Sequence, residues 1–137
     1  MKQIILVAHG NLGQEMKNSG EMIFGELPNF CPISFLKEEG LDSLTEKITW
    51  QVKKADETLI LTDLFCGTPY NAGCSAAMKE TDKTIEVLSG MSLPLILEAA
   101  TNLEHKSVTE VAAELKAIAC DVVKSFSDQI IAEEEDF

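Results

Sequence analysis

The hydrophobic pattern of this chain switches repeatedly between two kinds of segment. Short, mainly apolar runs without a helical period are typical of strands buried on both faces of a parallel sheet. These runs occupy residues 4–8, 32–36, 58–63 and 84–88. Between them, apolar residues recur every three or four positions, which predicts amphipathic helices. The predicted helices span residues 12–23, 41–55, 69–78, 93–100 and 108–118.

The order of these elements predicts an α/β fold with a mainly parallel open sheet flanked by helices. A last segment, residues 122–126, has strand composition with polar alternation, so we expect an antiparallel edge strand there. The length of 137 residues suits one domain. We place this domain at residues 1–130, followed by an acidic tail at 131–137 that is expected to be solvated and disordered.

Local signals mark where three of the predicted helices begin. Ser43 with Glu46, and Ser107 with Glu110, have the spacing of capping boxes at the starts of the second and the last helix. Thr68 is the expected N-cap of the third helix, because threonine is a favoured N-cap residue. Pro69 would then take the first helical position, where proline is common.

The charge balance excludes some classes of partner. The chain has 23 Asp and Glu against 11 Lys and Arg, a formal net charge of -12. Its field would repel nucleic acid and anionic membrane surfaces. The four cysteines form no Cys-x-x-Cys pair, which favours a reducing cytosol, and no apolar run approaches the roughly 20 residues of a membrane span. We therefore expect a cytoplasmic protein.

Two strand ends carry the candidate chemistry. His9 ends the first strand and Asp63 ends the third, and right-handed crossovers bring these ends to the same edge of the sheet. An aspartate that accepts the Nδ1 proton of a histidine leaves the Nε2 lone pair free for nucleophilic attack. The N–H groups at the start of the third helix, with the Thr68 hydroxyl, would supply a cradle for an anion.

Three segments resemble a known family. They read Val-Ala-His-Gly at 7–10, Asp-Leu-Phe-Cys-Gly-Thr-Pro-Tyr-Asn-Ala at 63–72, and Val-Leu-Ser-Gly-Met-Ser-Leu-Pro-Leu at 87–95. This pattern is similar to that of the enzyme IIA domains of the mannose family of the phosphoenolpyruvate-dependent sugar phosphotransferase system. It departs from the family at Cys66, where many members have glycine, and at Leu64 and Phe65, which replace a pair that is often bulkier or aromatic.

The resemblance implies a phosphotransferase that works as a phosphocarrier. His9 would accept a phosphoryl group from phospho-HPr and pass it to enzyme IIB for sugar uptake and phosphorylation, with Asp63 as its partner. Gly10, Gly67 and Thr68 would hold the phosphate, and no metal or other cofactor is implied. Membrane permease subunits would be indirect partners, and the protein would be a homodimer that exchanges the strand at 122–126. The sugar is not specified.

Four other interpretations remain open at this point. The nearest is the phosphocarrier that serves dihydroxyacetone kinase, which has the same fold and an equivalent histidine. A serine hydrolase would use Ser75 in Gly-Cys-Ser-Ala-Ala, but the second glycine of the nucleophile elbow is missing. A non-catalytic module could bind an anion at the same edge of the sheet. A metal site would combine His9, Asp63, Cys66 and His105, although His105 is expected in an exposed connection.

Overall fold

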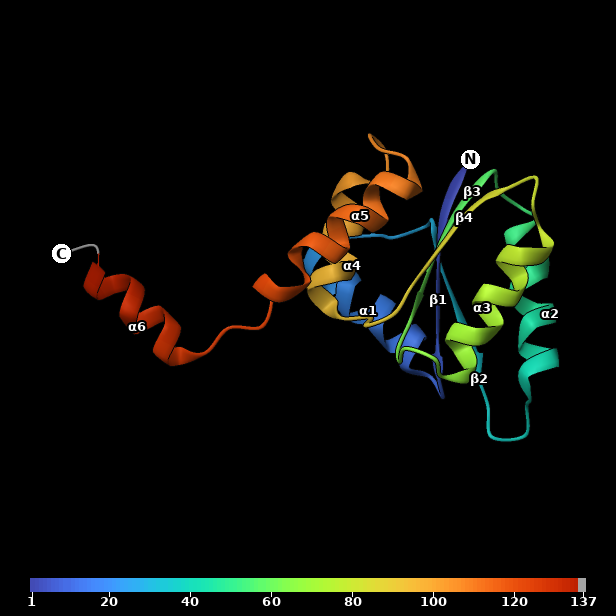
Figure 1. The fold of residues 1–137 in the computed structure, drawn as a ribbon, viewed down its shortest axis with the longest axis horizontal. Helices are drawn as coiled ribbons and strands as arrows, with labels where there is room; N and C mark the ends of the chain where they lie inside the picture. The colour runs from blue at the N-terminus through green and yellow to red at the C-terminus, as the bar shows by residue number, and fades with distance from the viewer. Residues whose placement is uncertain (136–137) are drawn as a thin grey trace.

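Four parallel strands form one sheet in the part of the chain that the computed structural model describes, residues 1–135 (Figure 1). The order across the sheet is β2-β1-β3-β4. The strands are β1 Lys2–His9, β2 Phe30–Phe35, β3 Glu57–Thr62 and β4 Thr84–Leu88. The register aligns His9 with Phe35 and Val7 with Thr62, so the carboxyl ends of β1, β2 and β3 lie together. The predicted parallel α/β fold is confirmed.

The helices form a layer on each face of the sheet, as Figure 1 shows. They are α1 Leu12–Phe24, α2 Leu41–Val52, α3 Thr68–Lys79, α4 Leu93–Asn102 and α5 Val108–Ile118, followed by a 3₁₀ turn η1 Ala119–Asp121 and α6 Phe126–Glu135. One core lies between the sheet and α4 and α5, and the other lies between the sheet and α2 and α3. None of the described helices is both long and apolar enough to span a membrane.

β1 is central because it contributes to both cores. Ile4 and Leu6 pack into the core with α4 and α5, whereas Ile5 and Val7 pack into the core with α2 and α3. This double burial explains the unbroken apolar run in the sequence. α1 approaches the strand closely at Gly13, where an added Cβ would lie 2.6 Å from the carbonyl oxygen of Leu6. The tight β1–α1 connection fixes the position of His9 at the end of β1.

The predicted capping boxes had different outcomes. Ser107 and Glu110 form the expected box, because the Glu110 N–H donates to the Ser107 Oγ and the Ser107 N–H donates to the Glu110 carboxylate. The Ser43–Glu46 prediction is wrong. α2 begins at Leu41, where the helix is predicted, but its N-cap is Gly40, three residues before Ser43. The Gly40 N–H donates to the Ser43 Oγ at 3.3 Å.

The predicted edge strand at 122–126 is absent from the single chain, which enters α6 at Phe126. Ser125 and Asp128 explain this difference. The Asp128 N–H donates to the Ser125 Oγ at 3.2 Å, and the Ser125 N–H donates to the Asp128 carboxylate at 3.0 Å. This local capping favours a helix, and no sheet edge of the same chain meets the segment.

The C-terminal helix stands away from the body of the molecule in Figure 1. α6 continues to Glu135 and therefore includes residues 131–135 of the predicted acidic tail. Residues 136–137, the end of the predicted tail, lie outside the described residues. The C-terminal segment is thus helical where it is described and lies apart from both cores.

The two edges of the sheet differ in how their backbone groups are used. On β2, the Phe30 N–H donates to the Leu27 carbonyl at 3.1 Å, Pro32 has no N–H, and the Ser34 carbonyl accepts from the Lys47 Nζ at 3.3 Å. Proline and lysine on an edge are common devices against further strand pairing. The outer side of β4 pairs with no strand among residues 1–135. β4 is therefore the open edge.

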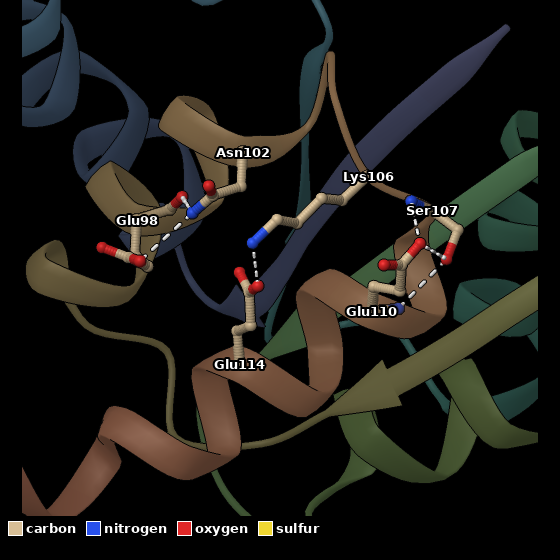
Figure 2. Close-up of polar contacts among 6 residues, drawn as sticks. All are labelled: Glu98, Asn102, Lys106, Ser107, Glu110 and Glu114. Carbon is tan, nitrogen blue, oxygen red and sulfur yellow. Dashed lines mark hydrogen bonds and ion pairs between the residues drawn. The ribbon is translucent and has the colours of Figure 1, made fainter.

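Polar contacts join the α4–α5 connection to its neighbours (Figure 2). Lys106 forms an ion pair with Glu114 of α5, and its carbonyl accepts a hydrogen bond from the Lys2 Nζ at 2.8 Å. Asn102 in turn donates to Glu98 one turn earlier in α4. The hydrogen bond to Glu114 raises the pKa of Lys106 above its ordinary value. The ion pair ties the connection to α5, and the hydrogen bond from Lys2 ties it to the start of β1.

Glu114→Gln should lower the stability of the fold slightly at neutral pH, because it removes the charge that Lys106 faces. A lysine with a raised pKa stabilises the folded state below its unfolded pKa, and this contribution is lost as the pH rises through the folded pKa. Urea unfolding should therefore give a difference in the free energy of unfolding between wild type and variant that is constant near neutral pH. This difference should decrease above about pH 10.4. A difference that stayed unchanged at high pH would contradict the assignment.

Candidate functional site

His9 is placed at the carboxyl edge of the sheet as the last residue of β1. Its side chain is 50% exposed, whereas the preceding apolar residues of the strand are buried. Gly10 follows with φ of 60°, a left-handed conformation that glycine adopts without strain, and its N–H donates to the Phe35 carbonyl at 2.8 Å. The chain thus turns sharply after His9 and leaves the imidazole at the surface.

Asp63 directly follows β3 and holds His9 through two contacts. Its Oδ2 lies 2.7 Å from the His9 Nδ1 and accepts the His9 backbone N–H at 3.0 Å. Its other oxygen, Oδ1, accepts the Leu64 N–H at 2.8 Å. The side chain of Asp63 is only 11% exposed. The expected neighbourhood of His9 and Asp63 is found, and it fixes the imidazole from both backbone and side chain.

The ionisation of Asp63 decides the tautomer of His9. Burial works to raise the pKa of Asp63, but hydrogen bonds from the backbone and ring of His9 and from the Leu64 N–H outweigh it and lower the pKa. An ionised carboxylate only accepts hydrogen bonds, so Nδ1 carries the proton and Nε2 keeps its lone pair. Because the folded pKa is lowered, this ionisation stabilises the fold above about pH 3.9 and the contribution is lost as the pH falls through the folded pKa.

The start of α3 lies against the imidazole. A Cβ added to Gly67 would lie 3.7 Å from the His9 Cε1, so the backbone comes close to the ring. Gly67 is the N-cap, with φ of −74° and ψ of 170°, and Thr68 is the first helical residue rather than the predicted cap. Pro69 accordingly takes the second position. The free N–H groups and partial positive charge at this helix start suit an anion.

Phe35 is a site residue that sequence reasoning did not identify. Its ring meets the His9 ring edge to face, with centroids 5.5 Å apart and an interplanar angle of 73°. Phe35 and His9 pair in the register of β1 and β2, and that register depends on two segments far apart in the sequence. The only local signal was an aromatic residue at the end of the predicted second strand.

Cys66 shapes the loop between Asp63 and α3. It has φ of 62°, an uncommon conformation for a residue with a side chain, and the Gly67 N–H donates to the Leu64 carbonyl at 3.3 Å across it. Turns with a positive φ at the third residue usually carry glycine there. The Cys66 carbonyl accepts from the Asn71 Nδ2 at 3.2 Å, which ties this turn to the first turn of α3.

The rival sites are not assembled. No group of three or more His, Cys, Asp or Glu among the described residues could hold a metal ion. His105 lies in the exposed α4–α5 connection, whose carbonyls bond Lys2 at the start of β1, the opposite end of the strand from His9. Ser75 lies within α3 rather than at a strand-to-helix turn. The geometry therefore favours a site built on His9.

Comparison with known proteins places these features in a family. The sequence model described as "PTS system fructose IIA component" matches residues 3–116. The sorbose-specific EIIA component from Lacticaseibacillus casei is 43% identical, with 98% of this chain and 99% of that protein covered. The fructose-specific EIIA component from Bacillus subtilis (strain 168) is 35% identical, with coverage of 87% and 82%.

Solved structures of similar proteins have the same fold. The phosphotransferase system component EIIA from Streptococcus agalactiae superposes with a TM-score of 0.88 at 30% identity, covering 93% of this chain and 99% of that chain. A mannose/sorbose-specific IIA subunit from Enterococcus faecalis gives 0.82 at 32% identity, covering 92% and 96%.

Proposed function

Because this chain belongs to the mannose, fructose and sorbose family of EIIA components of the sugar phosphotransferase system, we propose that it is a histidine phosphocarrier. It accepts a phosphoryl group from phospho-HPr on His9 and passes it to enzyme IIB, which serves sugar uptake through membrane permease subunits. The observation that carries this proposal is the 2.7 Å contact between the His9 Nδ1 and Asp63, which leaves Nε2 as the nucleophile.

The transfer exchanges one N–P bond for another. The Nε2 lone pair of His9 attacks phosphorus in line with the donor nitrogen, the donor N–P bond breaks, and its electron pair returns to the donor imidazole. His9 keeps its Nδ1 proton and becomes a positively charged ring, which the carboxylate of Asp63 stabilises. The bonds are of similar energy, so positioning and charge stabilisation are sufficient for the step.

The phosphate oxygens need donors close to Nε2. The backbone at Gly67, the N-cap of α3, comes close to the His9 ring, and Thr68 with its hydroxyl is the first residue of the helix that follows. Gly10, the residue after His9, carries no side chain that would obstruct the phosphate, and the space where its Cβ would stand is open. We assign phosphate binding to Gly10, Gly67 and Thr68.

Reconstitution with purified components tests the function. The protein is incubated with phosphoenolpyruvate, enzyme I and HPr, and the acid-labile phosphate is mapped by mass spectrometry. Label on His9 that is discharged by enzyme IIB supports the proposal. Absence of label, or label that is discharged only to dihydroxyacetone kinase, would overturn it in favour of another carrier. The sugar-specific names of the curated relatives favour the sugar system, but they differ among sorbose, fructose and mannose.

We also propose that the protein acts in the cytoplasm as a homodimer, in which residues 122–126 cross to the open β4 edge of the second copy. The support is physical. Val123 and Phe126 are 82% and 78% exposed in the single chain, and the segment lies apart from its own body (Figure 1). Pairing with β4 would bury these side chains and satisfy the backbone groups of both edges.

Phe126→Ser should weaken this dimer by at least about tenfold, because burying a phenylalanine contributes roughly 1.5–3 kcal/mol. Within one chain Phe126 is exposed, so circular dichroism of the folded protein should be unchanged. A shortened chain ending at Cys120 should lose the dimer and be aggregated or markedly destabilised. Analytical ultracentrifugation at micromolar concentration would measure the oligomeric state of the intact chain and of both variants. An intact chain that is monomeric at this concentration would show that the proposed dimer is wrong.

A further inference from the structure

His9 lies between the two strands that flank the central strand β1. The order of the sheet places β2 on one side of β1 and β3 on the other. Asp63 follows β3 and contacts the His9 Nδ1, while Phe35 ends β2 and is the register partner of His9. Because side chains alternate along a strand, His9 and Val7 lie on the same face of the sheet, and both Val7 and Phe35 pack against the core with α2 and α3. The imidazole is therefore contacted by a carboxylate from the β3 side and by an aromatic ring from the β2 side.

The contact with Asp63 alone does not fix the plane of the imidazole. A ring held through a single hydrogen bond at Nδ1 can turn about that bond and still keep it, and the side chain of His9 is 50% exposed, so solvent does not restrain it. In-line transfer requires the Nε2 lone pair to point at phosphorus, and a displacement of about 1 Å can cost about a hundredfold in rate. A second contact on the ring is therefore needed to hold Nε2 in the reactive orientation.

The ring of Phe35 supplies this second contact. Its centroid lies 5.5 Å from that of the imidazole and the two planes make an angle of 73°, which is the edge-to-face geometry that aromatic pairs prefer. The backbone of the same residue contributes as well, because the Phe35 carbonyl accepts the Gly10 N–H at 2.8 Å. At another point of the ring, a Cβ added to Gly67 would lie 3.7 Å from the His9 Cε1, the carbon bonded to Nε2. Phe35 thus limits the imidazole to orientations that keep Nε2 near the start of α3.

Phe35 is itself held in place by the end of β2. The Ser34 carbonyl accepts from the Lys47 Nζ at 3.3 Å, and the Leu36 N–H donates to the Glu39 carboxylate at 3.0 Å. Lys47 and Glu39 in turn form an ion pair at 2.6 Å. The residues on both sides of Phe35 are therefore bonded to one ion pair, which joins α2 to the turn before it. A side chain that is fixed by its neighbours and by packing can position another group, whereas a mobile one cannot.

We propose that Phe35 is a positioning residue for phosphoryl transfer, which holds the His9 imidazole so that Nε2 stays at the start of α3. The inference rests on the proposed function, and it adds the residue that sets the orientation of the nucleophile. Phe35 contacts the imidazole rather than the phosphoryl group or its donor, so its loss should slow the chemical step and leave the affinity for the donor unchanged.

Phe35→Leu tests this with two phosphoryl donors. Leucine keeps an apolar side chain against the core but removes the aromatic ring. With phospho-HPr, the single-turnover rate at saturating donor should fall by about fivefold to tenfold, while the donor concentration that gives half this rate should stay within about twofold of its wild-type value. With phosphoramidate, a small donor whose N–P bond breaks as the bond to Nε2 forms and ammonia leaves, the rate of His9 labelling should fall by the same factor. Phe35→Tyr, which keeps the ring, should restore both rates.

Phe30→Leu is the matched control. It is the same substitution in the same strand, but Phe30 begins β2, pairs with Ile4 in the register and is buried in the core with α4 and α5. This variant should lower the free energy of unfolding at least as much as Phe35→Leu does, because Phe30 is the more buried of the two. Its folded form should nevertheless be labelled by both donors at the wild-type rate.

Nuclear magnetic resonance reports the orientation of the imidazole directly. In the wild type, the three-bond couplings of the His9 side chain should be those of a single rotamer, and in Phe35→Leu they should be averaged over several rotamers. Phe30→Leu should keep the wild-type couplings. This measurement needs no phosphoryl donor.

Three results would overturn the positioning role. The first is weaker binding of phospho-HPr by Phe35→Leu with an unchanged phosphoramidate rate, which would assign Phe35 to donor binding. The second is an unchanged rate with both donors, and the third is equal slowing in Phe35→Leu and Phe30→Leu, which would indicate a general loss of packing. Failure of phospho-HPr to label even the wild type would overturn the proposed function, whereas the phosphoramidate rates and the His9 couplings would still decide the role of Phe35.

Discussion

His9→Ala should abolish phosphoryl labelling by phospho-HPr while leaving the fold intact. The imidazole is half exposed at the end of β1, so its removal creates no buried cavity, but it removes the nucleophilic Nε2. The chain has two histidines, and the other one, His105, lies in the α4–α5 connection at the opposite end of β1. Labelling should fall to background in a gel or mass-spectrometric assay.

The second histidine provides the control for this prediction. His105 is exposed at the other end of the sheet, and His105→Ala should be labelled like the wild type. Acid-labile phosphate that persisted in His9→Ala, or that mapped to His105 or to Ser75, would show that the phosphorylated residue has been assigned wrongly.

Asp63→Asn should keep the fold and slow phosphoryl transfer by about a hundredfold. Loss of the partner of a catalytic histidine commonly costs roughly two to four orders of magnitude. We expect the lower end because no proton has to be abstracted from a poor nucleophile. The amide keeps the shape of the carboxylate but loses the charge that stabilises the phosphorylated ring, and it no longer enforces the tautomer with a proton on Nδ1.

Rapid-quench measurement of a single turnover from phospho-HPr would give this rate directly. Asp82→Asn is a suitable control, because Asp82 is an exposed carboxylate in the turn before β4 and should have no effect. If Asp63→Asn transferred phosphate at the wild-type rate, Asp63 would have no part in the mechanism. Nitrogen chemical shifts of His9 would report the change of tautomer independently of the rate.

The sequence was sufficient to predict the pairing of His9 with Asp63, because that pairing follows from a general rule. Apolar runs identified β1 and β3, and right-handed crossovers bring the ends of parallel strands to one edge. The contact with Phe35 could not be predicted in the same way. It depends on the register between β1 and β2, which is set by side-chain packing across the whole sheet rather than by any local signal.

The errors at helix ends and at the C-terminus have local causes. Thr68 and Gly67 are adjacent, and the extended conformation of Gly67 moved the N-cap of α3 by one residue. Residues 122–126 have the composition of a strand, but the reciprocal hydrogen bonds between Ser125 and Asp128 favour the start of a helix. In one chain the local hydrogen bonds determine the structure, because the segment leads away from the open β4 edge of its own sheet (Figure 1).

Because the β2 edge is blocked and the β4 edge is open, the sheet has one edge that can accept a further strand. An open edge on both sides would let each molecule recruit a neighbour at either end, and the result would be an unlimited fibre. Here Pro32 and the contacts of Phe30 and Ser34 leave β2 unable to receive another strand, so β4 is the single point of growth. Under the proposed exchange each molecule has one donor segment and one acceptor edge at β4, so association stops at a pair only when the two copies exchange their segments reciprocally.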